Sequence, residues 1–133
     1  HKAKLPQLAP AELDVMKVLW RQGPSSAREI HDRLATDTGW AYSTTRTVLE
    51  RMVGKGLLGR QSLHGLHVYE AAVSRPAGLA GLVRDFAEQV LELRHVPVAA
   101  LFAQSEALSA AELAELRTLL DEHPPAKRPR ERR

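Results

Sequence analysis

The chain has 133 residues, 44% of them hydrophobic and 26% charged, which is the composition of one or two small globular domains. Aromatic residues make up only 5%, which favours a helical core of Leu, Val and Ala over a β-sandwich. The absence of cysteine excludes disulfides, thiolate metal sites and a cysteine nucleophile. The sequence contains neither an apolar run long enough to span a membrane nor a signal peptide, so we expect a cytoplasmic protein with no membrane partner.

Charge is distributed unevenly along the chain. Residues 1–75 hold 11 basic and 7 acidic side chains, residues 76–122 hold 3 and 8, and residues 123–133 hold 5 and 1. We therefore expect a basic first domain suited to a polyanion, an acidic second domain, and a basic tail. The tail has no large apolar residue, which predicts disorder, although it could also bind nucleic acid non-specifically.

Two helices are predicted at the start of the first domain. Apolar residues recur at helical spacing from Pro10 and stop at Gly23-Pro24. A capping box at Ser26-Ala27-Arg28-Glu29 then opens a second helix, which breaks at residues 37–39. His31 stands among charged residues on this second helix and is expected to be solvated.

A third helix with two different faces follows. We expect Ser43 to cap it and Gly56 to end it. Its inner stripe is Thr45, Val48, Leu49 and Met52, and its outer face is Ser43, Thr44, Arg46, Thr47 and Arg51. Arginine can pair with guanine, and threonine offers a hydroxyl and a methyl to thymine, so the outer face suits DNA. Simple capping and solvation are the alternative explanation of this face.

A β-hairpin follows the third helix. Residues 57–62 and 67–73 are predicted strands, joined by a turn at residues 63–66. Helices followed by a hairpin in this order are typical of a winged helix-turn-helix, whose third helix enters the DNA major groove while the hairpin lies beside the backbone. The fold class is therefore mainly α with a small β-hairpin wing.

The second domain, residues 76–122, is predicted to be helical and to dimerise. An apolar stripe runs from Leu79 to Leu93, Pro97 interrupts it, and a capping box at Ser109–Glu112 opens a last helix. So small a helix pair cannot bury two apolar faces alone. The expected dimer contacts are Leu79, Leu82, Val83, Phe86, Val90, Leu101, Phe102, Leu113, Leu116 and Leu120.

Several segments carry a resemblance to a known family. They are residues 11–20 (AELDVMKVLW), Trp40, residues 44–56 (TTRTVLERMVGKG), Tyr69 with Val73, and residues 108–113 (LSAAEL) with Leu116. From about Leu8 to Glu122 the chain resembles the penicillinase and methicillin-resistance repressors, the BlaI/MecI family of winged-helix regulators. The resemblance implies a homodimeric transcriptional repressor that binds a dyad operator with the outer face of its third helix.

The chain departs from this family in three places. The family often has Gly-Arg in the wing turn, where this chain has His64-Gly65, so wing contacts would fall to Arg60, Gln61 or His64. The paired cysteines of a copper-responsive branch are absent. The family is inactivated by a cut at an Asn-Phe pair. The matching pair in this chain is Leu101-Phe102, which keeps the Phe and loses the Asn. Two hypotheses therefore stay open: cleavage at this pair by a sensor protease, or a different inducing signal.

Other functions find little support in the residues. No triad or carboxylate pair is placed for catalysis, so we expect no enzyme activity and no cofactor. His64 and His67 lack a third ligand in the sequence, so no metal site is predicted. The remaining alternative is a winged helix that binds protein instead of DNA, against which the acid-poor face of the third helix argues.

Overall fold

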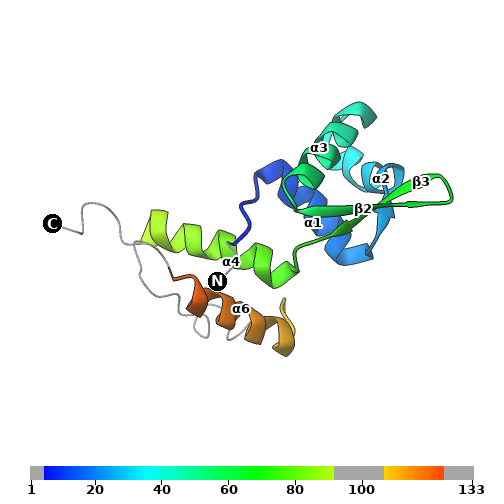
Figure 1. Cartoon of the computed structure of the whole chain (residues 1–133). Coiled ribbons are helices and arrows are strands. Elements are labelled where there is room, and N and C mark those ends of the chain that lie inside the picture. The colour runs from blue at the N-terminus through cyan, green and yellow to red at the C-terminus, as the bar shows by residue number, and fades with distance from the viewer. Residues whose placement is uncertain (1–4, 92–106, 125–133) are drawn as a thin grey trace. The chain divides into compact units, whose positions relative to one another are not determined.

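The computed structural model describes residues 5–91 and 107–124, which form two compact units (Figure 1). The first unit is Leu8–Ser74, and the second contains residues 5–7 together with the described residues from Arg75 onward. The sequence had placed residues 5–7 in the first domain. In the structure they belong to the second unit, because Leu5, only 5% exposed, packs into the apolar cluster of that unit. No local sequence pattern reveals this contact.

Helices α1 (Pro10–Gln22) and α2 (Ala27–Thr38) begin and end as the sequence predicts. The capping box of α2 is present: Glu29 donates its amide to Ser26 Oγ at 3.1 Å, and Ser26 donates its amide to Glu29 Oε1 at 2.8 Å. Gly39 ends α2 in the left-handed conformation, at a φ of 72°, which glycine adopts without steric cost. The sequence does not predict the hydrogen bond that caps the start of α1, in which Ala9 donates its amide to Glu12 Oε1 at 2.9 Å.

Helix α3 (Tyr42–Gly54) begins one residue earlier than expected. The prediction that Ser43 caps it is wrong. Ala41 is the N-cap, and its carbonyl accepts from the amides of Thr44 and Thr45 at 3.0 and 3.1 Å. Alanine offers no side-chain acceptor, so the local signal pointed to the nearest serine instead. At the other end Gly56 has a φ of 81°, as predicted for the residue after a helix.

The sheet of the first unit has three antiparallel strands in the order β1-β3-β2. The predicted hairpin is present as β2 (Leu58–Leu63) and β3 (Leu66–Ala71), with somewhat different strand ends. His64 and Gly65 both have positive φ, 52° and 78°, as a two-residue type I′ turn requires. Strand β1 (Ser25–Ser26) was not predicted, because two serines carry no strand pattern, yet it pairs with β3.

The core of the first unit lies between the helices and the sheet. All four predicted inner residues of α3 are buried, and Thr45, Leu49 and Met52 are fully so. The prediction that His31 is solvated is wrong. It is 9% exposed, its Nδ1 lies 2.7 Å from Thr45 Oγ1, and its ring meets Tyr42 edge-on. This polar contact joins α2 to α3 inside the core.

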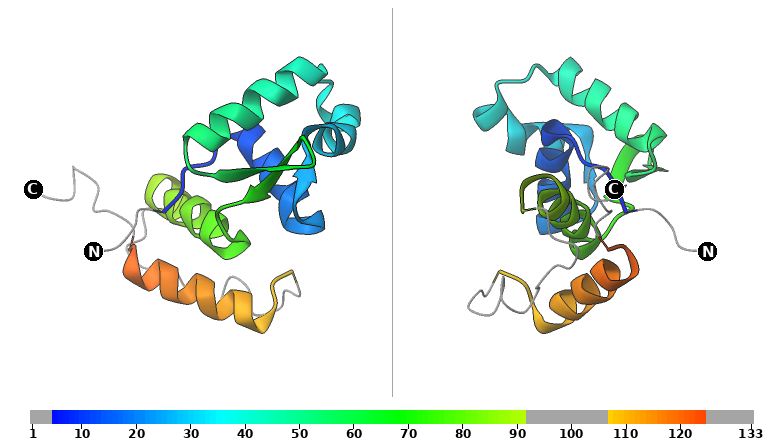
Figure 2. Two further views of the ribbon diagram at one scale, coloured as in Figure 1. Left: turned by 45° about the vertical axis from the view of Figure 1, so that its right-hand side comes forward. Right: turned by 90° about the vertical axis from the view of Figure 1, so that its left-hand side faces the viewer.

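The second unit contains α4 (Arg75–Phe86), a π-helical turn η1 (Ala87–Leu91) and α6 (Ala110–Glu122). Figure 2 shows α4 and α6 side by side. Helix α4 begins at Arg75, before the expected Leu79, and its fully buried residues are small ones such as Ala80 and Gly81. Among the dimer residues expected from the sequence, Leu101 and Phe102 lie outside the described residues, as do Leu93, Pro97 and residues 125–133.

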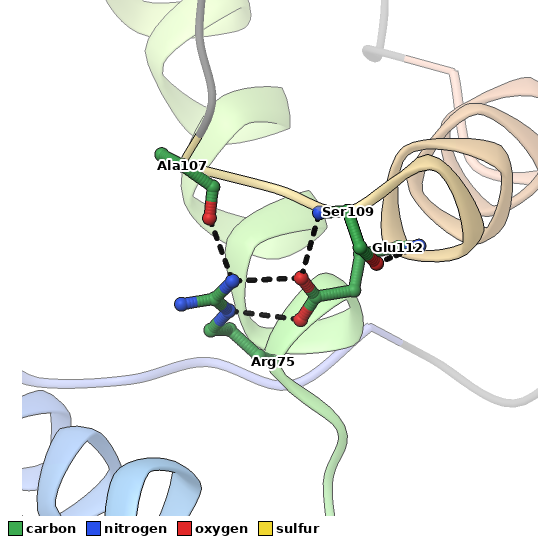
Figure 3. A network of polar contacts seen from close by, with 4 residues as sticks. All are labelled: Arg75, Ala107, Ser109 and Glu112. Carbon is green, nitrogen blue, oxygen red and sulfur yellow. Dashed lines mark hydrogen bonds and ion pairs between the residues drawn. The ribbon is translucent and has the colours of Figure 1, made fainter.

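One carboxylate connects the beginnings of α4 and α6 (Figure 3). Arg75 donates Nε and Nη2 to the two oxygens of Glu112, at 2.9 and 2.7 Å, and Nη2 also to the carbonyl of Ala107 at 2.7 Å. The predicted capping box is confirmed, because Glu112 and Ser109 exchange hydrogen bonds of 3.1 Å. The Arg75 guanidinium and the Ser109 amide lower the pKa of Glu112.

Candidate nucleic-acid interface

The outer face of α3 is open to solvent. Its five predicted members, Ser43, Thr44, Arg46, Thr47 and Arg51, are all exposed, while the opposite stripe is buried. The Thr47 hydroxyl donates to the carbonyl of Ser43 at 3.0 Å, and its oxygen can still accept a hydrogen bond. Buried packing on the opposite side of α3 thus holds the backbone beneath this face.

Arg46 borders a hollow between α3, the beginning of α2 and the hairpin. The hollow measures about 220 Å³ and is lined by Arg28, Tyr42, Leu66 and His67 among others. Arg28 lies over the Tyr42 ring, with its guanidinium carbon 4.0 Å from the centroid, and Arg46 lies 5.9 Å away on the same ring. Within the described part of the chain no carboxylate pairs with either arginine, so both cations remain available to an anion.

Arg51 stands at the edge of this face and pairs with a buried carboxylate. Its Nε lies 3.5 Å from Glu12 Oε2, and Lys55 Nζ lies 2.8 Å from both Glu12 oxygens. Burial raises the pKa of Glu12, but the hydrogen bonds from Lys55 and Ala9 and the Arg51 charge outweigh it, so the net pKa is lowered. The three charged groups tie the end of α3 to the beginning of α1.

The hairpin is fastened to α3 by Glu50. The buried Tyr69 hydroxyl donates to Glu50 Oε2 at 2.6 Å, and Arg60 Nη1 donates to Glu50 Oε1. These hydrogen bonds, first from Tyr69 and then from Arg60, lower the pKa of Glu50. Burial and the bond to Glu50 raise the pKa of Tyr69. The acid that interrupts the basic face of α3 is thus a structural link to the wing.

The other predicted wing residues lie on the hairpin surface. His64 occupies the exposed turn, and exposed Gln61 donates its side-chain amide to Glu70 Oε1 at 3.3 Å. Arg28, Tyr42 and His67, which also line this side of the unit, are not predicted from the sequence. The acid-free stretch between residues 62 and 69 was the signal that would have included His67.

A larger hollow lies away from this face, between α1 and α2, and measures about 520 Å³. It is lined mainly by polar and charged residues such as Asp14, Arg33 and Asp37. The described ranges 5–91 and 107–124 contain no cluster of three or more His, Cys, Asp or Glu side chains able to hold a metal. None of the helices described there has the length and apolarity needed to cross a membrane.

Three helices, with an exposed face on the third, followed by a hairpin in a small antiparallel sheet define the chain as a winged helix-turn-helix protein. A family model described as Penicillinase repressor matches residues 8–122, and the chain belongs to this family of transcriptional repressors, which are not enzymes. It is 28% identical over 120 residues to the Penicillinase repressor of Bacillus licheniformis, covering 90% of this chain and 94% of that protein.

Two further proteins are similar. The methicillin resistance regulatory protein MecI of Staphylococcus aureus is 25% identical over 115 residues, which cover 86% of this chain and 94% of MecI. The solution structure of monomeric Bacillus licheniformis BlaI in complex with the blaP half-operator matches with a TM-score of 0.50 and 31% identity. That match covers 56% of this chain and 90% of the BlaI chain.

Proposed function

We propose that the chain represses transcription by binding a dyad operator in duplex DNA as a homodimer. The observation that carries the proposal is the exposed hydroxyl and arginine face of α3, backed by a fully buried stripe, in a unit similar to BlaI solved with a half-operator. DNA binding also implies that the chain acts in the cytoplasm.

We assign base reading to Arg46 and Thr47 and backbone contacts to the residues around them. Arg46 has no carboxylate partner in the described ranges, so its guanidinium is free to pair with guanine. Arg51 pairs with Glu12 and Arg60 pairs with Glu50, so each guanidinium is held in place, which suits it to a phosphate contact. We assign further contacts with DNA to Ser43 and Thr44, which are exposed on the outer face of α3, and to His64, in the exposed hairpin turn.

The experiment is a titration of duplex DNA at several salt concentrations. The probes are a random-sequence duplex and a duplex selected from a random pool by the wild-type chain. Arg46→Ala should weaken binding to the selected duplex by about 1–3 kcal/mol. Arg33→Ala, which removes an exposed arginine from α2, is the matched control and should leave affinity unchanged. A wild-type chain whose binding does not weaken as salt rises would refute DNA binding and favour a protein-binding winged helix.

The proposed dimer contact is the part of α4 that the second unit leaves uncovered. Phe86 is 53% exposed, and neither it nor Leu82 belongs to the apolar cluster of this unit. Leu116 and Leu120 are buried within the unit, while Leu79, Val83 and Leu113 are partly buried around them. A second copy covering Leu82 and Phe86 is therefore the simplest partner. We also propose a dimer contact at Val90, which belongs to η1.

Sedimentation tests this dimer. Phe86→Asp should give a monomer, because a charge would be buried without a partner. Thr118→Asp adds the same charge at an exposed position of α6, away from the buried Leu116 and Leu120, and should leave the dimer intact. A wild-type monomer at tens of micromolar would refute the proposal.

Release of the repressor is proposed to follow a cut by a sensor protease at Leu101-Phe102, in the segment between η1 and α6. A cut there separates α6 from α4, whose packing forms the second unit. The test is an immunoblot of the host after treatment with a β-lactam. A full-length protein alongside full derepression would refute cleavage and indicate a ligand or partner as the inducer.

A further inference from the structure

The tip of the hairpin carries an apolar pair that the fold leaves uncovered. Leu63 and Leu66 are direct partners across the two-residue turn and are 50% and 57% exposed. Figure 1 shows this turn projecting beyond the helices of the first unit. A single exposed leucine is common on protein surfaces, but two facing leucines at a protruding tip form one continuous apolar surface.

The surroundings of this pair indicate what kind of partner covers it. Residues 62–69 contain no Asp or Glu, and His64 and His67 flank the leucines. Leu66 also lines the hollow that contains Arg28 and Arg46, so the apolar tip continues directly into the cationic side of the unit. A fitting partner therefore presents apolar groups between rows of negative charge.

The minor groove of duplex DNA has this chemistry. Its walls are deoxyribose C–H groups, and phosphates border it on both sides. Because major and minor grooves alternate along a duplex, a hairpin beside a helix in the major groove reaches the neighbouring minor groove. Leucine is among the apolar residues that proteins insert there.

We propose that Leu63 and Leu66 pack against the deoxyribose walls of the minor groove next to the one that α3 enters. The inference rests on the proposed function and adds a contact that requires no charge. The pair should therefore increase affinity without changing the number of phosphates neutralised, which sets the slope of log affinity against log salt concentration.

The experiment compares two double variants of the full chain. Leu63→Ser with Leu66→Ser removes the apolar surface, and Leu63→Met with Leu66→Met keeps it. Because both leucines are half exposed, both variants should fold. The fluorescence of Trp20 and Trp40, which lie in this unit, verifies the folding. Affinity is measured over a range of salt concentrations on the selected and random-sequence duplexes described above.

The serine variant should bind the selected duplex about tenfold more weakly at every salt concentration, with the wild-type slope, and the methionine variant should bind like wild type. Arg51→Ala provides the contrast, because loss of a phosphate contact reduces the slope by about one. Wild-type affinity in the serine variant overturns the inference and leaves the proposed function standing. A serine variant that binds DNA normally but loses self-association in sedimentation also overturns the inference, because the leucines would then contact a second copy of the chain instead of DNA. Loss of salt-dependent binding in the wild type refutes both.

Discussion

Removing one buried hydroxyl tests whether Glu50 fastens the hairpin to α3. Tyr69→Phe keeps the fully buried ring but deletes the oxygen that donates to Glu50 at 2.6 Å. A hydrogen bond to a charged group contributes about 1.5–3 kcal/mol. The Glu50 side chain is 43% exposed and keeps Arg60, so water can partly replace the lost donor. We therefore expect a loss of about 1–2 kcal/mol in the free energy of unfolding.

Urea denaturation followed by tryptophan fluorescence measures this loss. Both tryptophans of the chain, Trp20 and Trp40, lie in the first unit, so the signal reports the unit that contains Tyr69. With a denaturant dependence of about 1–2 kcal/mol per molar urea, the midpoint should fall by about 1 M. Tyr42→Phe is the control, because within the part of the chain described by the structure its hydroxyl makes no hydrogen bond. An unchanged midpoint for Tyr69→Phe would refute the proposed fastening.

The same variant has a predictable pH dependence. The pKa of Glu50 is lowered in the folded state by the bonds from Tyr69 and Arg60. The stabilisation is therefore fully present above the ordinary glutamate pKa of about 4.3 and is lost as the pH falls through the lower folded value. The difference between wild type and Tyr69→Phe should be largest near neutral pH and shrink in acid. A difference that grows in acid would contradict this assignment.

Two further predictions concern other contacts. Glu12→Gln should lower the free energy of unfolding by about 1–3 kcal/mol at neutral pH, since the charge facing Lys55 is lost. The lowered Glu12 pKa means that this difference too narrows in acid urea titrations. Gly81→Ala places a Cβ 2.4 Å from the Pro6 carbonyl oxygen, so it should displace residues 5–7 and speed limited proteolysis of that segment. Gly54→Ala, with open space around it, should not.

Local patterns predicted those parts of the fold that depend on neighbours in the sequence. The capping boxes at Ser26 and Ser109 and the glycine at residue 56 were readable because each acts within a few residues. The inner stripe of α3 was readable because burial follows the helical period. The start of α3 was not, because Ala41 caps it with its backbone alone.

Contacts between distant residues had no such signal. Glu12 and Lys55 are 43 positions apart, and Glu50 and Tyr69 are 19 apart, so neither pair is visible in a helical or strand period. Glu50 therefore looked like an interruption of a DNA-binding face, although it holds the wing. The leucines of α4 looked like its core, whereas Ala80 and Gly81 are the residues that allow close packing.

The buried contact between His31 and Thr45 has a consequence for the evolution of the chain. Replacing Thr45 by valine alone leaves the His31 ring nitrogen, 2.7 Å away, without its partner in the core. Such an orphaned polar group costs about 1–3 kcal/mol, whereas replacing both members with apolar residues of similar shape can be nearly neutral. A substitution at one position alone should therefore be selected against, whereas substitutions at both positions should be tolerated. Across diverging lineages the two positions are expected to be exchanged as a unit, and a survey of relatives in which they vary independently would contradict this expectation.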